Sequence, residues 1–317
     1  MIRNLENLII KVGDVDRRVI FVLIGLAVLI PLLTPISLPI RETPTTVKFY
    51  EGIEEIPKGS KVLVSFDYGP STRPEIHPMN VAVLRHMLRN EHKVYISCLW
   101  PDGIYMALDA LEDISDEFSL KEYEDYVLLG YRPGAEAVIK GLASDLRKVY
   151  TVDANGKFID DIEMMDNVKN LNDFAYIYSG SAGYPGTFEW VKYGGDPTGV
   201  RMSSGTTSVQ VNEVIPYVRS GQLIGLLAGM PGAAEYEKLV ESPGIAIKGM
   251  AAQSFAHIVI VVFMILSTIM DPRDGWFSFC SSVSHYFVIR AGTSVGFVSY
   301  RYLQVPPYFQ FSSWRCC

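Results

Sequence analysis

Residues 61–90 read KVLVSFDYGPSTRPEIHPMNVAVLRHMLRN, and this stretch indicates how the central part of the chain folds. Its first six residues, 61–66, are mostly apolar and β-prone, which is typical of a buried strand. A polar, proline-rich segment follows, and the end of the stretch has apolar residues at helical spacing. The stretch therefore predicts a strand, a loop and a helix, with Pro78 in the first helical turn, where its missing N–H costs nothing.

The same order recurs along the chain. Further strand candidates lie at 94–100, 126–131, 174–183, 199–207 and 222–232. Helix patterns follow most of them, at 104–111, 135–146, 209–218 and 233–242. Strands that alternate with helices form open, mainly parallel sheets with helices on both faces. We therefore expect an α/β domain with a doubly wound sheet of about six strands.

One segment departs from this alternation. Residues 149–162 read VYTVDANGKFIDDI, and the Asn155-Gly156 pair between β-prone flanks predicts a two-residue hairpin. The acidic and amide residues of this segment resemble part of a calcium loop. An EF-hand loop ends in a bidentate Glu, and the corresponding position here is Met164, so the hairpin is the better interpretation.

Two uncharged apolar segments flank this domain. Residues 19–38 and 249–270 are each long enough to cross a hydrocarbon core of roughly 30 Å as a helix. The first segment has an 18-residue leader and no small-x-small cleavage site after it, so we expect a retained anchor rather than a cleaved signal peptide. The sequence thus predicts a leader (1–18), two transmembrane helices, a domain at 42–248 and a tail at 271–317.

The charges near the first segment predict an orientation. Arg3, Lys11, Arg17 and Arg18 precede it, which favours a cytoplasmic N-terminus. Two spans return the C-terminus to the same side, so residues 42–248, which are acidic overall, are expected outside the cytoplasm, in a prokaryotic plasma membrane. The 271–317 tail shows no clear period and is assigned no function.

Within the second segment, Gln253 and His257 are four residues apart and share one helix face. Such polar residues satisfy one another across helices, which predicts a partner membrane protein or self-association through this face. Placement of both residues in the headgroup region is the simpler alternative.

Composition excludes several classes of function. The net charge is −7 and no dense basic run occurs, so we expect no nucleic-acid partner. The four cysteines lack the paired spacings of zinc sites or disulfide frameworks. No G-x-G-x-x-G and no P-loop follows any predicted strand, so neither a metal nor a cofactor is expected.

Polar residues follow several of the predicted strands. In doubly wound sheets, ligands bind beyond the carboxyl ends of the strands, so these residues are expected to line one rim. The arginines would pair with an anionic group, and the carboxylate would accept a hydrogen bond from a hydroxyl or an amine. The candidate ligand-binding residues are Asp67, Arg73, Arg132, Ser181, Ser204 and Thr206. In the structural alternative, Asp67 and Arg73 satisfy one another and the serines cap helices.

Other chemistry at the rim is less well supported. The turn expected at 203–207 resembles an anion-binding helix start, with helix capping as the alternative. A metal site at Asp67, Glu75 and His77 is weaker, because the intervening prolines leave its geometry open. No serine has the G-x-S-x-G context of a nucleophile elbow.

Two function classes remain. The first is a non-catalytic, membrane-anchored extracytoplasmic module that binds a small polar or anionic ligand or a partner membrane protein. The second is a membrane-bound hydrolase or transferase that uses the same rim. The absence of an intact catalytic signature favours the first.

Two short runs carry a resemblance. GAAEYE (232–237) and AAQSFAH (251–257) resemble segments of uncharacterised prokaryotic two-span membrane proteins. The resemblance covers few residues and implies no activity.

Overall fold

The computed structural model describes residues 17–34 and 39–270. The chain divides into two units, one formed by Gly25–Ala256 and the other by Met1–Ile24 with His257–Cys317. The predicted leader (1–18) lies almost wholly outside the described residues, and the predicted tail (271–317) lies entirely outside them.

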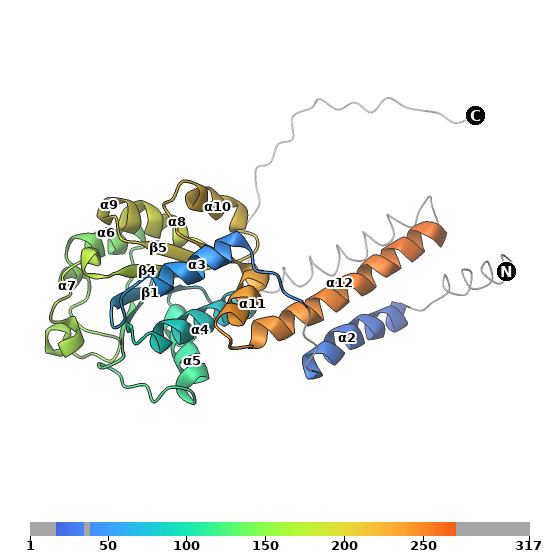
Figure 1. The fold of residues 1–317 in the computed structure, drawn as a ribbon, viewed down its shortest axis with the longest axis horizontal. Helices are drawn as coiled ribbons and strands as arrows, with labels where there is room; N and C mark the ends of the chain where they lie inside the picture. The colour runs from blue at the N-terminus through green and yellow to red at the C-terminus, as the bar shows by residue number, and fades with distance from the viewer. Residues whose placement is uncertain (1–16, 35–38, 271–317) are drawn as a thin grey trace, which may run out of the picture. The chain divides into compact units, whose positions relative to one another are not determined.

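The Gly25–Ala256 unit contains a six-stranded sheet in which every pair of neighbouring strands is parallel, in the order β3-β2-β1-β4-β5-β6. Figure 1 shows the neighbouring strands β1, β4 and β5 of this sheet. The strands are β1 (Lys61–Asp67), β2 (Lys93–Cys98), β3 (Tyr126–Tyr131), β4 (Tyr176–Ser181), β5 (Met202–Thr206) and β6 (Leu226–Ala228). The predicted α/β class with a parallel six-stranded sheet is confirmed. The strand order reverses direction between β1 and β4, which is where sheets of this class place their ligands.

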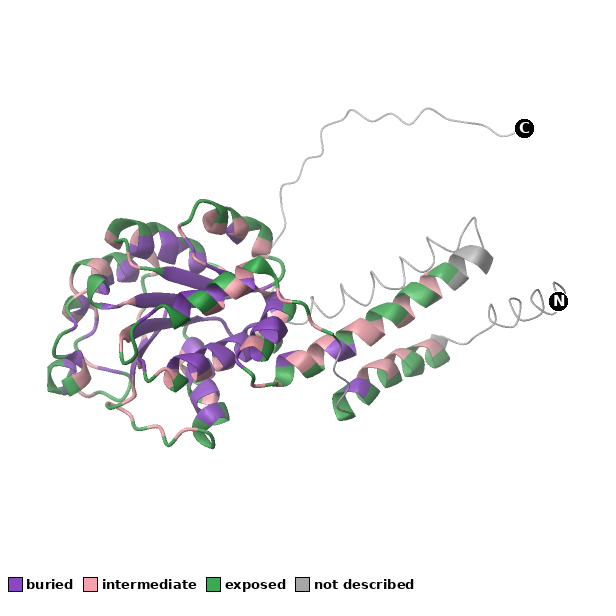
Figure 2. Cartoon of the chain, viewed as in Figure 1, coloured by how far each residue is buried: buried purple, intermediate pink, exposed green. Residues whose placement is uncertain are grey.

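Helices cover both faces of the sheet. One face carries α3 (Pro44–Glu54), α4 (Arg73–Arg89), α5 (Gly103–Ser115) and α11 (Gly229–Leu239). The other carries α6 (Glu136–Ser144), α7 (Leu146–Val149), α8 (Thr187–Trp190) and α10 (Val211–Arg219), together with the short elements η1 (Ile159–Asp161), η2 (Glu163–Met165), η3 (Leu171–Asp173), η4 (Val191–Gly195) and α9 (Asp196–Thr198). Each face has its own apolar core, and the strands between them are almost wholly buried (Figure 2).

The alternation of side chains along β1 explains the two cores. Val62, Val64 and Phe66 belong to the core under α4 and α5, whereas Leu63 belongs to the core under α6. Successive side chains of a strand point to opposite faces, so a continuous apolar run fills both cores. This is why the stretch at 61–66 lacks the apolar-polar alternation of a half-exposed strand.

Three local predictions need correction. Helix α4 begins at Arg73 with Pro74 in its first turn, so Pro78 lies inside the helix rather than in its first turn. Residues 203–206 belong to β5, as the strand predicted at 199–207 implies, and not to the turn also expected at 203–207. Helix α10, expected from residue 209, begins only at Val211.

The segment expected as a hairpin is a compact loop. Val152 and Phe158 form an isolated antiparallel bridge, but no strands continue from it. Asp153 Oδ1 closes the loop by accepting hydrogen bonds from the backbone N–H groups of Asn155 and Lys157 (2.9 and 2.8 Å). The side chain of the aspartate thus replaces the strand pairing that the Asn-Gly signal predicts.

Two apolar helices accompany the domain, α2 (Arg17–Leu33) and α12 (Ile245–Met270). Among the described residues, one helical stretch, Ile245–Ile265, is long and apolar enough to cross a membrane, judged by length and composition. The apolar part of α2, Arg18–Leu33, is shorter than that. Residues 35–38 of the predicted first span lie outside the described residues, so the two-span arrangement stays a prediction.

Candidate functional site

Two rows of small polar side chains cross the sheet near its carboxyl edge. In the first row, Ser97, Ser65, Ser179 and Ser204 stand side by side on β2, β1, β4 and β5. In the second row, Asp67, Ser181 and Thr206 end β1, β4 and β5 in register. The alternation of the strands places both rows on the face covered by α6 and α8, directly across the point where the strand order reverses.

Asp67 is the only charged side chain in these rows and is fully buried. Its Oδ2 accepts hydrogen bonds from Ser65 Oγ (2.7 Å) and from the indole Nε1 of Trp190 (2.9 Å), and its Oδ1 accepts from the backbone N–H of Leu99 (2.8 Å). Burial raises the pKa of Asp67 to about 7, although the three donors counteract this effect. The carboxyl group therefore connects the loop after β2 to helix α8.

Several hydroxyl groups of the two rows are only partly satisfied. Ser181 Oγ donates to Gly183 O and accepts from the backbone N–H of Thr187, both at 3.3 Å. Ser204 Oγ lies 2.6 Å from Thr187 Oγ1 and 3.0 Å from Ser179 O. The hydroxyl groups of Ser179 and Thr206 are buried without a partner. An unpaired buried polar atom costs free energy, and such atoms are few in native proteins.

Helix α8 closes over this polar cluster. A Cβ atom on Gly186 would lie 1.9 Å from Ser181 Oγ, so only glycine permits the chain to pass so close to the end of β4. Of the six predicted ligand-binding residues, the structure brings together Asp67, Ser181, Ser204 and Thr206 and covers them.

The two arginines do not join this cluster. Arg73 starts α4 and pairs with Asp109 of α5 (3.2 Å), and both side chains are about half exposed. Arg132, after β3, donates to the carbonyl oxygens of Tyr131, Val149 and Val152 and lies over the Tyr150 ring. The two guanidinium groups are held by different elements, and neither pairs with Asp67. The role of the six residues in ligand binding stays a prediction.

Other predicted rim residues have structural partners. Glu75 accepts from the backbone N–H of Ser208 at 2.7 Å and also bonds its hydroxyl group. His77 lies between Tyr68 OH (2.8 Å) and Asp113 Oδ2 (3.0 Å). Within the described ranges, no group of three His, Cys, Asp or Glu side chains could hold a metal ion.

Among the described residues, neither His77 nor His86 is hydrogen-bonded to a serine or cysteine that it could activate as a nucleophile. His77 bonds a tyrosine and an aspartate, and His86 bonds Tyr236 OH and Glu54 Oε1, both at 2.6 Å. Burial lowers the pKa of both imidazoles below the ordinary value, so they are neutral at pH 7. The hydrogen bonds of His77 and His86 join α4 to neighbouring elements, and neither histidine bonds a serine.

An open pocket of about 340 Å³ lies at the same carboxyl edge. The loops after β2, β3 and β4 supply its lining, which consists of Leu99, Trp100, Pro101, Tyr131, Gly134, Ala135, Tyr184 and Pro185. Three of these residues are aromatic, and Tyr184 is 70% exposed. This pocket, unlike the covered polar cluster, is accessible from solvent.

The polar cluster supports the wall of this pocket. Leu99 is held by its N–H bond to Asp67, and the Trp100 indole donates to Pro185 O (2.8 Å), which joins the loops after β2 and β4. Opposite them, Gly134 and Ala135 have positive φ values of 128° and 46°, and Ala135 precedes α6 without a side-chain cap. A non-glycine residue in this region is strained, and such strain is concentrated at functional sites.

Trp100 and Tyr131 are the last residues of the strands predicted at 94–100 and 126–131, but the sequence alone suggested no role for them and did not single out Tyr184. The signal for Tyr184 is its position in the loop GYPG (183–186) directly after β4. Aromatic residues in loops after neighbouring parallel strands are expected at one edge.

A second set of charged side chains, on α11, lies in the run GAAEYE (232–237) and just after it. Glu235 Oε2 accepts from the backbone N–H and the hydroxyl group of Thr43, which precedes α3. Glu237 accepts from the backbone N–H groups of Gly244, Ala246 and Ile247, at the start of α12 (2.9 to 3.0 Å). Lys238 bonds Ile40 O and Glu42. Helix α11 therefore holds both connections between the domain and its flanking helices.

In comparisons with known proteins, no protein family, no curated protein and no solved structure matches this sequence.

Proposed function

We propose that this chain is a membrane-anchored, non-catalytic α/β module that binds a small ligand in the aromatic pocket at the carboxyl edge of its sheet. The observation that carries the proposal is the open pocket formed by Trp100, Tyr131 and Tyr184 at the carboxyl ends of β2, β3 and β4. Open α/β sheets bind ligands in that position.

The lining favours a ligand with a flat apolar face and a polar or anionic group. Aromatic side chains offer large faces for stacking. The start of α6 lies at the pocket through Gly134 and Ala135, and a helix start attracts negative charge. The volume of about 340 Å³ suits a small molecule with a single ring rather than a dinucleotide.

The proposed anchoring rests on the apolar stretch Ile245–Ile265 and on the contacts of α11 with the start of α12. We further propose that the domain is extracytoplasmic, that both termini are cytoplasmic, and that the exposed Gln253 and His257 pair with another membrane helix. A cysteine placed at exposed Asp161 tests the orientation, because it should react with a membrane-impermeant maleimide on intact cells. Labelling only after lysis would contradict it.

Ligand screening on the full chain in lipid nanodiscs tests the binding site. The screen consists of small ring-bearing carboxylates and phosphates, followed by ligand-observed NMR. A true ligand should lose about fivefold or more in affinity in Tyr184→Ala, since stacking on an aromatic ring contributes on the order of 1 kcal/mol or more.

Phe158→Ala is the matched control, because Phe158 is an aromatic residue of similar exposure (63%) outside the pocket. The affinity of the Phe158→Ala variant for the ligand should equal that of the parent chain. Equal loss in both variants, or no loss in Tyr184→Ala, would reject this pocket as the site.

A further inference from the structure

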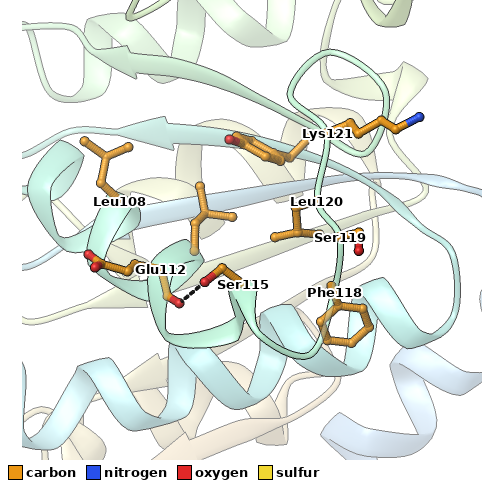
Figure 3. Close-up of a pocket in the computed structure, with 9 residues that line it drawn as sticks. Leu108, Glu112, Ser115, Phe118, Ser119, Leu120 and Lys121 are labelled. Atoms are coloured by element: carbon orange, nitrogen blue, oxygen red, sulfur yellow. Dashed lines mark hydrogen bonds between the residues drawn. The ribbon is translucent and has the colours of Figure 1, made fainter.

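Two neighbouring pockets lie at the opposite, amino-terminal edge of the sheet, and residues 118–120 line both of them; together they are called the groove below. One is a pocket of about 630 Å³ between α5 and the segment that follows it (Figure 3). The other is a pocket of about 290 Å³ next to the start of β2. Phe118, Ser119 and Leu120 line both pockets.

The floor of the groove is apolar. Leu108, Leu111, Phe118 and Leu120 line the larger pocket. Leu108 and Glu112 come from α5, and Phe118 and Leu120 come from the segment that follows it (Figure 3). In the smaller pocket, Leu88 continues the apolar surface. A surface of this kind takes the hydrocarbon part of a ligand.

His92 lines the smaller pocket and is buried, with neither ring nitrogen paired. Burial lowers the pKa of His92, so the imidazole is neutral and presents one donor and one acceptor. Leaving both nitrogens unpaired is costly, and a bound molecule that donates to the accepting nitrogen would remove part of that cost.

The charges of the groove select the sign of the ligand. Lys93 pairs with Asp125 (3.4 Å) and Lys121 pairs with Glu124 (3.1 Å). The carboxylates of Glu91 and Glu112, one in each pocket, make no ion pair or hydrogen bond with described residues. The unpaired charge along the groove is therefore negative.

We propose that this groove binds a small organic ammonium ion with an apolar substituent. The hydrocarbon part lies on Leu88, Phe118 and Leu120, and the ammonium group donates to the His92 imidazole and pairs with Glu91. The proposal concerns a second site, at the other edge of the sheet from the aromatic pocket.

The test uses three probes of equal chain length on the full chain in zwitterionic nanodiscs: hexylammonium, hexanol and hexanoate. Saturation-transfer NMR titrations, corrected with empty nanodiscs, give the affinities. Hexylammonium should bind at least about tenfold more tightly than the neutral and anionic probes. Its binding should also shift the His92 imidazole ¹⁵N resonances. Equal affinity of the three probes, or no binding of hexylammonium, overturns the proposal.

Variants identify the residues. Glu91→Gln removes an exposed charge and should weaken hexylammonium binding about tenfold, whereas Glu213→Gln, an exposed carboxylate on α10, should leave it unchanged. His92→Phe should weaken it similarly, and if this variant fails to fold, Glu91→Gln decides. Unchanged affinity in Glu91→Gln would show that the groove does not recognise the ammonium group.

Discussion

Asp67 and Glu237 are both buried carboxylates whose pKa is raised by burial, yet they hold different parts of the molecule. Asp67 accepts from two side chains and one backbone N–H at the carboxyl end of the sheet. Glu237 accepts from three backbone N–H groups at the start of α12. The first carboxylate organises the loops of the candidate site, and the second fastens the apolar helix to the domain.

The difference teaches that the two functions proposed for this chain, binding and anchoring, depend on separate buried charges. Asp67 and its partners come from β1, the loop after β2 and α8, whereas Glu237 and its partners lie between residues 237 and 247. Substitutions at one carboxylate should therefore leave the surroundings of the other intact, because distant sites without shared partners act additively.

The largest expected effect concerns Trp190, which covers Asp67 and is fully buried. Trp190→Ala should lower the free energy of unfolding by about 3–5 kcal/mol, because it leaves a cavity and removes a donor from the carboxyl group. Chemical denaturation of the full chain in detergent micelles measures the loss. Trp190→Phe is the control, which keeps most of the volume and should lose about 1–3 kcal/mol. Equal losses would mean that the hydrogen bond, not the packing, dominates.

The stability of the parent chain and that of the Asp67→Asn variant should depend differently on pH. The pKa of Asp67, about 7 in the folded chain, exceeds its ordinary value of 3.8, so its contribution to stability is full below pH 3.8 and is lost as the pH rises to 7. The unfolding free energy of the parent chain minus that of Asp67→Asn should fall by roughly 4 kcal/mol between pH 4 and pH 8. Urea titrations across that range measure it, and a flat difference would contradict the raised pKa.

Glu237→Gln should cost about 1–3 kcal/mol, because an amide oxygen replaces only part of the carboxylate that holds three N–H groups. Hydrogen exchange should become faster at Gly244, Ala246 and Ile247 and stay unchanged at Leu99. Asp67→Asn should give the reverse pattern. If either substitution accelerates exchange at both places, the two carboxylates are coupled and the comparison fails.

The smallest effects should distinguish the two predicted site arginines. Arg132 binds three carbonyl oxygens, so Arg132→Ala should lose about 1–2 kcal/mol. Arg73 forms an exposed pair with Asp109, and Arg73→Ala should lose less than about 1 kcal/mol. Thermal unfolding of both variants measures which of them loses more stability. A larger loss in Arg73→Ala would show that its ion pair has a structural role that its exposure does not suggest.

Parts of the fold that depend on local pattern were predictable from the sequence. The six strands were all anticipated, and β3 has the predicted limits of 126 and 131. Helix α3 was not anticipated, although Thr46, Phe49 and Ile53 are buried at helical spacing and would have indicated it. The strand ends indicated that Asp67, Ser181, Ser204 and Thr206 lie near one another, but not that α8 would cover them, and their role in ligand binding stays a prediction.

The sequence by itself determined the α/β class, because apolar runs and helical spacing are local properties of the chain. It also determined that polar residues end β1, β4 and β5. Only the tertiary structure decided which of these residues meet, since the order of strands in a sheet depends on packing between distant segments. Glu235 reaches Thr43 across 192 residues, and Trp190 reaches Asp67 across 123. No local pattern encodes such contacts, because they form only when both faces of the sheet are buried at once.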